Sequence, residues 1–139
     1  MAEANETKGT RTVLIIEDEM DMRFYLMAMV RSLGLESILT RDGVQGLSAL
    51  GTLRPDLIIL DVMMPEKGGG LVYQELKTNP LYQDIPLILF SGVDFQSFVH
   101  YIKMLNLNRE EKIPYPKYYV EKSANPDYLK EVIKKSLTP

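Results

Sequence analysis

Four consecutive apolar residues, Leu57 to Leu60, lead directly into the carboxylate of Asp61. Pro55 precedes this run, and Pro65 and three glycines at 68–70 follow it. An apolar run with such boundaries predicts a strand covered on both faces, as in a parallel sheet. Ligands of open α/β sheets bind beyond the carboxyl ends of the strands, which makes Asp61 a candidate site residue. The alternative is that Asp61 only opens a turn.

Short apolar runs alternate along the rest of the chain with segments whose apolar residues recur every three or four positions, as on one face of a helix. The other predicted strands are Thr12–Ile16, Leu35–Leu39, Leu87–Phe90 and Tyr118–Val120. The predicted helices are Met20–Leu33, Val44–Leu53, Leu71–Thr78, Phe95–Leu105 and a last helix that begins at Pro126 with Asn125 as its N-cap. This alternation with short connections predicts an α/β domain, in which helices cover both faces of a parallel sheet.

The composition limits the classes of function. A chain of 139 residues suits one domain, which we expect over residues 12–139, after a flexible N-terminal tail at 1–11. The formal charge of −3, with its basic residues scattered, argues against direct nucleic-acid binding. The absence of cysteine excludes disulfides and favours a cytoplasmic location. The polar first residues predict neither a signal peptide nor a membrane span, and the lone His100 is expected on the surface.

Polar residues follow several of the predicted strands. In a parallel sheet their carboxyl ends share one edge, which would gather Glu17, Asp18, Asp61, Ser91 and Lys122. Clustered carboxylates repel one another and usually hold a cation, and oxygen ligands favour Mg²⁺. The lysine and the hydroxyl could bind a phosphoryl group, so the cluster predicts an acyl phosphate formed on a carboxylate. Taken singly, each residue could instead be a helix cap, a turn residue or a solvated charge.

These motifs resemble those of response regulator receiver domains, the phosphoacceptor domains of two-component systems, from Val13 to Leu137. The runs Val-Leu-Ile-Ile-Glu-Asp-Glu, Leu-Ile-Ile-Leu-Asp-Val-Met-Met-Pro and Leu-Ile-Leu-Phe-Ser-Gly are similar to the family's acidic, phosphoacceptor and hydroxyl-bearing strands. The resemblance implies a flavodoxin-like receiver fold, a three-layer α/β/α domain with a five-stranded parallel sheet of order 2-1-3-4-5 and five helices.

The resemblance also implies roles for individual residues. Asp61 would be the phosphoacceptor, Ser91 and Lys122 would bind the phosphoryl group, Ser91 and Tyr119 would form the switch, and Mg²⁺ would be held by Glu17, Asp18, Asp61 and the backbone carbonyl of Met63.

By the same resemblance, a histidine kinase or phosphotransfer protein of a phosphorelay would supply the phosphoryl group. The phosphoprotein would then present an altered face to a downstream effector protein or domain, or form a homodimer. That face comprises the helix at 95–105, the strand at 118–120 and the last helix. The chain would act on no external substrate and bind no membrane. The main alternative is a receiver-like adaptor that is never phosphorylated. An enzyme is a weaker alternative, because phosphohydrolases that form an aspartyl phosphate carry a second acid where this chain has Met63.

Three features depart from the family pattern. Ser123 follows Lys122 where proline is usual, so no cis peptide bond is expected there and the direction of the lysine is open. The segment at 106–116 is longer than usual, and we expect it to influence the choice of partner. Met63 and Val93 are apolar where other members carry groups that orient water, which predicts a long-lived acyl phosphate.

Overall fold

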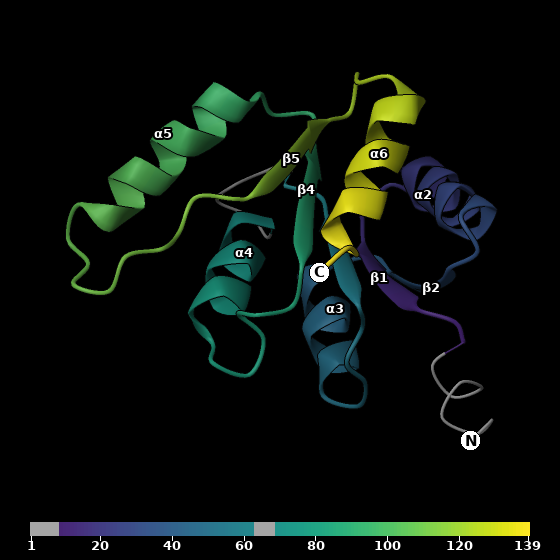
Figure 1. The fold of residues 1–139 in the computed structure, drawn as a ribbon. Coiled ribbons are helices and arrows are strands. Elements are labelled where there is room, and N and C mark those ends of the chain that lie inside the picture. Colours follow the sequence, from purple (N-terminus) through teal and green to yellow (C-terminus); the bar gives the residue numbers. More distant parts are fainter. Residues whose placement is uncertain (1–8, 63–68) are drawn as a thin grey trace.

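The computed structural model describes residues 9–62 and 69–139 (Figure 1). Its five strands form one parallel sheet in the order β2-β1-β3-β4-β5, as the resemblance implied. The strands are β1 (Thr12–Ile16), β2 (Glu36–Thr40), β3 (Leu57–Leu60), β4 (Leu87–Ser91) and β5 (Tyr118–Glu121). Because all five are parallel, their carboxyl ends lie along one edge of the sheet.

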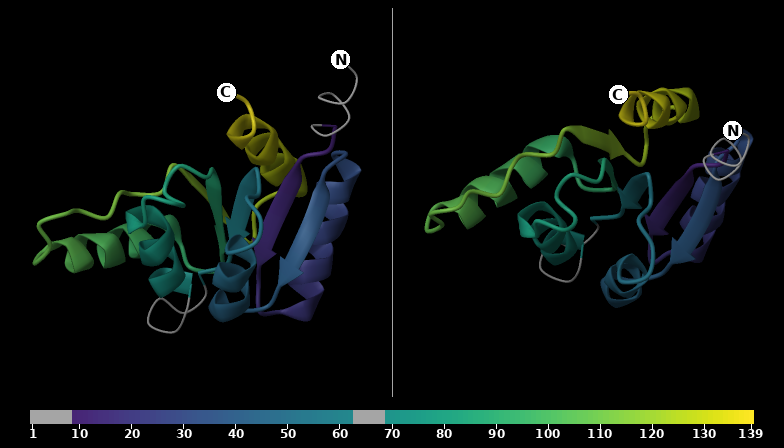
Figure 2. Two further views of the ribbon diagram at one scale, coloured as in Figure 1. Left: turned by 90° about the horizontal axis from the view of Figure 1, so that it is seen from below. Right: turned by 60° about the horizontal axis from the view of Figure 1, so that its bottom comes forward.

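Helices cover both faces of the sheet and complete the three predicted layers (Figure 2). The helices are α2 (Met20–Ser32), α3 (Gly43–Leu50), α4 (Gly69–Thr78), α5 (Phe95–Asn106) and α6 (Pro126–Ser136). Helices α2 and α6 lie on one face, and α3, α4 and α5 lie on the other. Asn125 caps α6 as predicted, since its side chain accepts a hydrogen bond from the backbone N–H of Asp127.

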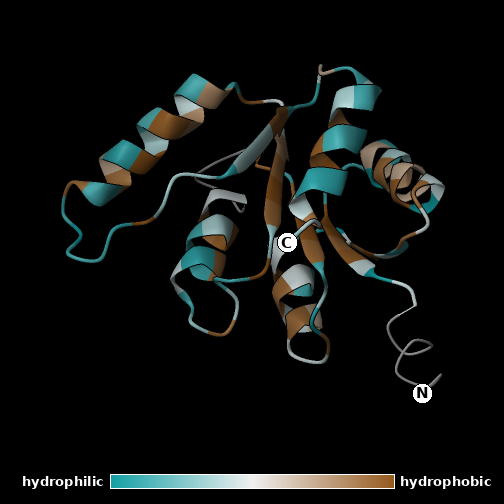
Figure 3. Ribbon diagram, viewed as in Figure 1, coloured by the Kyte–Doolittle hydropathy of each residue, from teal (hydrophilic) through white to brown (hydrophobic). Residues whose placement is uncertain are grey.

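Successive residues of each strand point to opposite faces, so the core has two halves. Ile58 and Leu60 pack against α3, α4 and α5, whereas Leu57 and Ile59 pack against α2 and α6. All four side chains of β3 are fully buried. The hydropathy colouring shows the resulting apolar centre along the strands (Figure 3). This continuous burial explains why β3 is an uninterrupted apolar run rather than an alternating one.

The predicted element boundaries differ from the observed ones by a few residues at most, and the start of α4 shows the reason for one such difference. Gly69 and Gly70 belong to the first turn of α4, whereas the sequence predicted that this helix begins at Leu71; Gly68 lies outside the described residues. A Cβ atom on Gly69 would lie 2.3 Å from the backbone oxygen of Asp61 and 2.6 Å from the Cα atom of Val62. Glycine therefore lets the start of α4 approach the end of β3.

The longer segment after α5 is irregular but attached to the domain. It runs from Leu107 to Lys117, and together with α5 it projects to the left in Figure 1. Ile113 is 1% exposed and belongs to the core half that contains α3, α4 and α5. The segment, called here the 107–117 loop, therefore contributes to the core as well as to the surface.

The remaining predictions concern the chain end and the surface. Residues 1–8 of the predicted tail lie outside the described residues. His100 is exposed on α5, as predicted. None of the helices that the structure describes combines the length and the apolar character that a membrane span needs.

The contact of Gly69 with β3 leads to a first prediction. Gly69→Ala should lower the free energy of unfolding by about 1 to 3 kcal/mol, because the new methyl group meets backbone atoms that cannot move independently. Gly51→Ala is the control, since Gly51 has a negative φ and the nearest atom to its Cβ would be 3.2 Å away. Urea unfolding measures both variants, and equal losses would contradict the proposed close packing.

Candidate functional site

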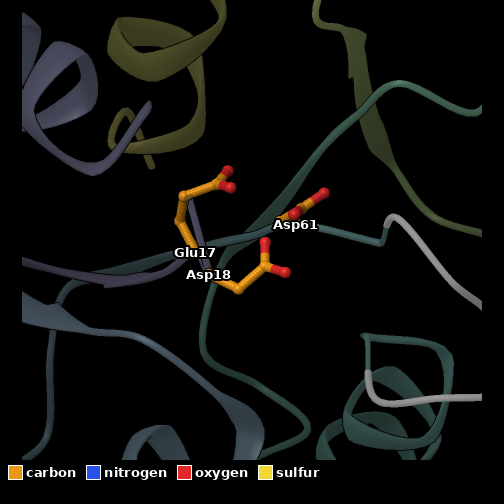
Figure 4. A group of neighbouring side chains, drawn as sticks. All are labelled: Glu17, Asp18 and Asp61. Atoms are coloured by element: carbon orange, nitrogen blue, oxygen red, sulfur yellow. The ribbon is translucent and has the colours of Figure 1, made fainter. Parts of the chain in front are cut away.

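Two acidic strand ends lie side by side at the carboxyl edge of the sheet. Strands β1 and β3 are in register, with Ile16 opposite Leu60, and the Asp61 N–H donates to the Ile16 carbonyl at 3.0 Å. This register places Glu17 and Asp18 next to Asp61 (Figure 4). One carboxylate oxygen from each of the three residues lies within 4.8 Å of the others. The strand pairing itself therefore creates the acidic cluster.

Strands β4 and β5 bring a hydroxyl and a cation to the same edge. Ser91 ends β4, and its carbonyl accepts a hydrogen bond of 2.8 Å from the Lys122 N–H. The Lys122 Nζ atom lies 3.3 Å from Glu17 Oε1 and 3.4 Å from Asp61 Oδ2. All five predicted residues thus lie at the same edge of the sheet, where Lys122 partly balances the carboxylates.

Ser123 does not turn the lysine away from the site. The peptide bond between Lys122 and Ser123 is trans, and the ammonium still reaches Glu17 and Asp61. The hydrogen bond from the Lys122 N–H to the Ser91 carbonyl fixes the backbone position of the lysine. From there the lysine side chain is long enough to reach both carboxylates.

Burial sets the protonation of the site. Glu17 and Asp61 are 1% and 8% exposed. Desolvation, followed by repulsion from Glu17, raises the pKa of Asp61 to about 8, although Lys122 opposes the shift. Desolvation also raises the pKa of Glu17. Burial disfavours the charged form of Lys122, but attraction to Asp61 and Glu17 prevails and raises its pKa. A single lysine therefore does not compensate the two buried carboxylates.

Two buried oxygen atoms in the cluster have no hydrogen-bond partner in the described part of the chain. They are Asp61 Oδ1 and Glu17 Oε1, of which the second lies near the Lys122 ammonium without a hydrogen bond to it. Buried polar atoms in proteins nearly always have a hydrogen-bond partner or a ligand, so these two oxygens are available to bind a ligand. Carboxylate oxygens at this separation, without histidine or cysteine, suit a hard divalent cation such as Mg²⁺. The predicted backbone ligand, Met63, lies outside the described residues.

The two predicted switch residues are connected through the segment after β4. The Ser91 hydroxyl donates to the Val62 carbonyl and accepts from the Val93 N–H, both at 2.9 Å. The Tyr119 hydroxyl donates to the Val93 carbonyl, and the Tyr119 ring packs against Phe95. Burial raises the pKa of Tyr119, and an interaction with Ser91 opposes the rise. Tyr119 thus already points inward, next to Ser91, in this structure.

Two further residues at the site were not predicted from the sequence. Glu19 Oε1 lies 3.6 Å from Lys122 Nζ, although the Glu19 side chain is 55% exposed. The Arg23 guanidinium donates to the carbonyls of Glu17 and Asp18, which fixes the backbone that carries both acids. The sequence shows Glu19 as a third acid after β1, but Arg23 carries no local signal, because its role depends on where α2 packs.

Comparison with curated proteins finds relatives that share part of this chain. The chain is 30% identical over 106 residues to the regulator of RpoS from Escherichia coli (strain K12), which covers 76% of this chain and 30% of that protein. It is 35% identical over 79 residues to the polar-differentiation response regulator DivK from Brucella anthropi, which covers 56% of this chain and 63% of DivK. The chain therefore spans about a third of the first of these relatives and less than two thirds of the second.

A solved structure and a family model cover nearly the whole chain. The signal receiver domain of a signal transduction histidine kinase from Syntrophus aciditrophicus is 27% identical, with a TM-score of 0.74 over 92% of this chain and 90% of that one. The model of the response regulator receiver domain matches residues 13–134. Receivers are signalling phosphoacceptors in two-component systems rather than enzymes that act on a separate substrate. On this match, the fold and the acidic pocket of Glu17, Asp18 and Asp61, the chain belongs to the response regulator receiver domain family.

Proposed function

We propose that the chain accepts a phosphoryl group on Asp61 and uses the resulting aspartyl phosphate to change a partner-binding face. The observation that carries this proposal is the Asp61 carboxylate, which is buried, has one unpaired oxygen, and lies between an acidic cation site and Lys122. A carboxylate that only opened a turn would be solvated. Its burial against Glu17 costs stability, and binding of a divalent cation offsets that cost.

The transfer itself follows from the positions of these groups. An Asp61 oxygen attacks the phosphorus of the donor, and the bond between phosphorus and the donor's leaving atom breaks. With a phosphohistidine donor, the electron pair of the broken P–N bond returns to the imidazole nitrogen. The Lys122 ammonium, 3.4 Å from Asp61 Oδ2, then pairs with the phosphoryl oxygens. The Ser91 hydroxyl releases the Val62 carbonyl and then donates a hydrogen bond to another phosphoryl oxygen.

The acidic cluster completes the site for a divalent cation. Glu17, Asp18 and Asp61 would hold Mg²⁺, with the backbone carbonyl of Met63 as a further proposed ligand. When bound, the ion neutralises charge on the carboxylates and on the phosphoryl oxygens, which is the main requirement of phosphoryl transfer. Arg23 supports the site from behind, because it holds the carbonyls of Glu17 and Asp18.

The proposed output face consists of α5, β5 and α6. Tyr119 lies at its centre, and a hollow between these elements is lined by Phe95, Tyr128 and Val132 among others. Because Ser91 contacts the Val93 N–H and Tyr119 contacts the Val93 carbonyl, movement of Ser91 toward a phosphoryl group changes the support of Tyr119. Phosphorylation therefore biases the packing of this face.

The proposed partners follow from family membership and remain general. A histidine kinase or phosphotransfer protein supplies the phosphoryl group, and a downstream effector protein or domain reads the face of α5, β5 and α6. Homodimer formation on phosphorylation and a cytoplasmic location stay predictions from the sequence, as does the assignment of residues 12–139 to one receiver domain.

A receiver-like adaptor that is never phosphorylated is the second candidate. It would need the fold but not the acidic cluster, since the repulsion between Glu17 and Asp61 destabilises a protein that binds no cation. Retention of this cluster with its lysine favours the phosphoacceptor.

Labelling tests the acceptor directly. With acetyl phosphate and Mg²⁺, the wild-type protein should gain the mass of one phosphoryl group, and Asp61→Asn should not, because an amide oxygen is too weak a nucleophile. Asp56→Asn is the matched control, since Asp56 lies just before the same strand and its side chain bonds the Thr12 N–H, away from the acidic cluster. Intact-protein mass spectrometry measures all three, and equal labelling of wild type and Asp61→Asn would refute the assignment.

Stability tests the cation site. Without divalent cations, Asp61→Asn should be more stable than wild type by about 1 to 3 kcal/mol at pH 9, because the fold disfavours a charge at this position. The folded-state pKa of Asp61 is raised to about 8, so the wild type loses stability as the pH rises toward 8. The difference between the two proteins should therefore narrow at pH 5.

Addition of Mg²⁺ should cancel most of this difference at high pH, or reverse it. At a concentration of 100 times the Kd, a bound ion stabilises the wild type by about 2.7 kcal/mol and should have little effect on Asp61→Asn. Urea unfolding with either EDTA or MgCl₂ measures both effects. Equal stabilisation of the two proteins by Mg²⁺ would contradict the assignment of the cation site.

The lifetime of the phosphorylated state is the next prediction. We expect the aspartyl phosphate to persist for minutes or longer in Mg²⁺ buffer, since the side chain of Val93 cannot orient an attacking water molecule. Val93→Gln should shorten the half-life, and Val93→Leu should leave it unchanged. Loss of the mass increment over time gives the rates, and a wild-type half-life of seconds would contradict the hypothesis.

A further inference from the structure

The 107–117 loop is held by specific contacts at its start and around Ile113. The Asn106 side chain donates to the Ile113 carbonyl at 3.0 Å and accepts from the Ile113 N–H at 2.8 Å. The Lys112 ammonium donates to the carbonyls of Asn106 and Arg109. These bonds close residues 107–112 into a compact loop and direct Ile113 into the core.

A buried tyrosine of α4 holds the other side of the loop. Tyr73 is fully buried, and its hydroxyl donates to the Pro114 carbonyl at 2.6 Å. Its ring packs edge to face against Phe98 of α5, with the ring centroids 5.4 Å apart. Tyr73 therefore connects the backbone of the loop to the aromatic cluster beneath α5.

The same cluster reaches the phosphorylation site. The Phe98 and Tyr119 ring centroids are 5.6 Å apart, and the Tyr119 hydroxyl donates to the Val93 carbonyl. The Val93 N–H in turn donates to Ser91 Oγ at 2.9 Å. Contacts thus run without a gap from Ser91, through Tyr119, Phe98 and Tyr73, to Pro114.

The first link of this series must change when Asp61 carries a phosphoryl group. The Ser91 hydroxyl now donates to the Val62 carbonyl, and it has to release that carbonyl before it can donate to a phosphoryl oxygen. The backbone of Val93 is bonded to both Ser91 and Tyr119, so its displacement also moves the Tyr119 hydroxyl. The Phe98 and Tyr73 rings behind Tyr119 are fully buried at native packing density, so a shift of Tyr119 against Phe98 is passed on to Tyr73.

We propose that Tyr73 is a positioning residue that couples the 107–117 loop to the switch, so that the loop changes its position with the phosphorylation of Asp61. This inference rests on the proposed function, and it means that the position of the loop reports whether Asp61 is phosphorylated. Because coupling is reciprocal, a partner that fixes the loop in one position also changes how readily Asp61 holds a phosphoryl group. The Tyr73 hydroxyl bond sets the scale, roughly a fivefold effect on the equilibrium between the two loop positions.

A deletion of the loop would not test this inference, because it would remove Ile113 from the core. A fluorescent reporter on the loop tests the inference without disturbing the core. The chain contains no tryptophan, and Tyr115, next to Pro114, is 49% exposed, so Tyr115→Trp places a single fluorophore on the loop. We expect its emission to change on treatment with acetyl phosphate and Mg²⁺, and not to change when Asp61→Asn is also present.

Tyr73→Phe, made in the Tyr115→Trp protein, removes only the hydroxyl that holds Pro114. Phosphorylation, measured by mass, should remain, whereas most of the emission change should be lost. Tyr82→Phe is the matched control, because Tyr82 packs against the same core half but its hydroxyl has no hydrogen-bond partner among the described residues. This control should keep the full emission change.

The outcomes separate the two proposals. If the Tyr115→Trp protein is phosphorylated without any change in its tryptophan emission, the coupling is overturned and the phosphoacceptor is intact, and this measurement needs no change at Tyr73. A change that survives Tyr73→Phe would overturn the role of Tyr73. A wild-type protein that takes up no phosphoryl group would overturn the proposed function, and the coupling with it.

Discussion

Repulsion between two buried carboxylates is the constraint on which the site depends. Glu17 and Asp61 are held side by side by the pairing of β1 with β3, and neither can move apart without breaking the sheet. Lys122 contacts both carboxylates but cannot satisfy every oxygen, and one oxygen of each acid lacks a hydrogen bond in the described part of the chain. The fold therefore maintains two buried carboxylates that a single lysine does not balance, an arrangement that favours binding of a cation.

The rest of the domain makes this strained arrangement tolerable. Strand β3 is fully buried on both faces, so it cannot slip or tilt to relieve the carboxylates at its end. Gly69 lets α4 approach the backbone of Asp61, and Arg23 holds the carbonyls beneath Glu17 and Asp18. The packed sheet therefore fixes the positions of the acids at its edge.

Local patterns in the sequence predicted most of the fold and the residues of the acidic edge. The buried run at 57–60 and the polar residues after the strands were sufficient, because parallel strands necessarily bring their carboxyl ends together. Contacts between distant elements could not be predicted in this way. The hydrogen bond from Tyr73 to Pro114 and the contact of Arg23 with Glu17 join residues whose own segments give no sign of a partner. The helical start at Gly69 was missed because three glycines favour a turn when packing is not known.

The clasp between Asn106 and Ile113 separates the length of the loop from the stability of the core. The Asn106 side chain bonds both backbone groups of Ile113, and Lys112 adds bonds to the carbonyls of Asn106 and Arg109, so the chain between them can vary while Ile113 keeps its place. Lengthening such a loop costs little, since the entropy of closure grows only slowly with the number of residues. Residues 107–112 therefore form a natural acceptor site for grafted peptides, where new recognition sequences can be installed on an otherwise unchanged domain.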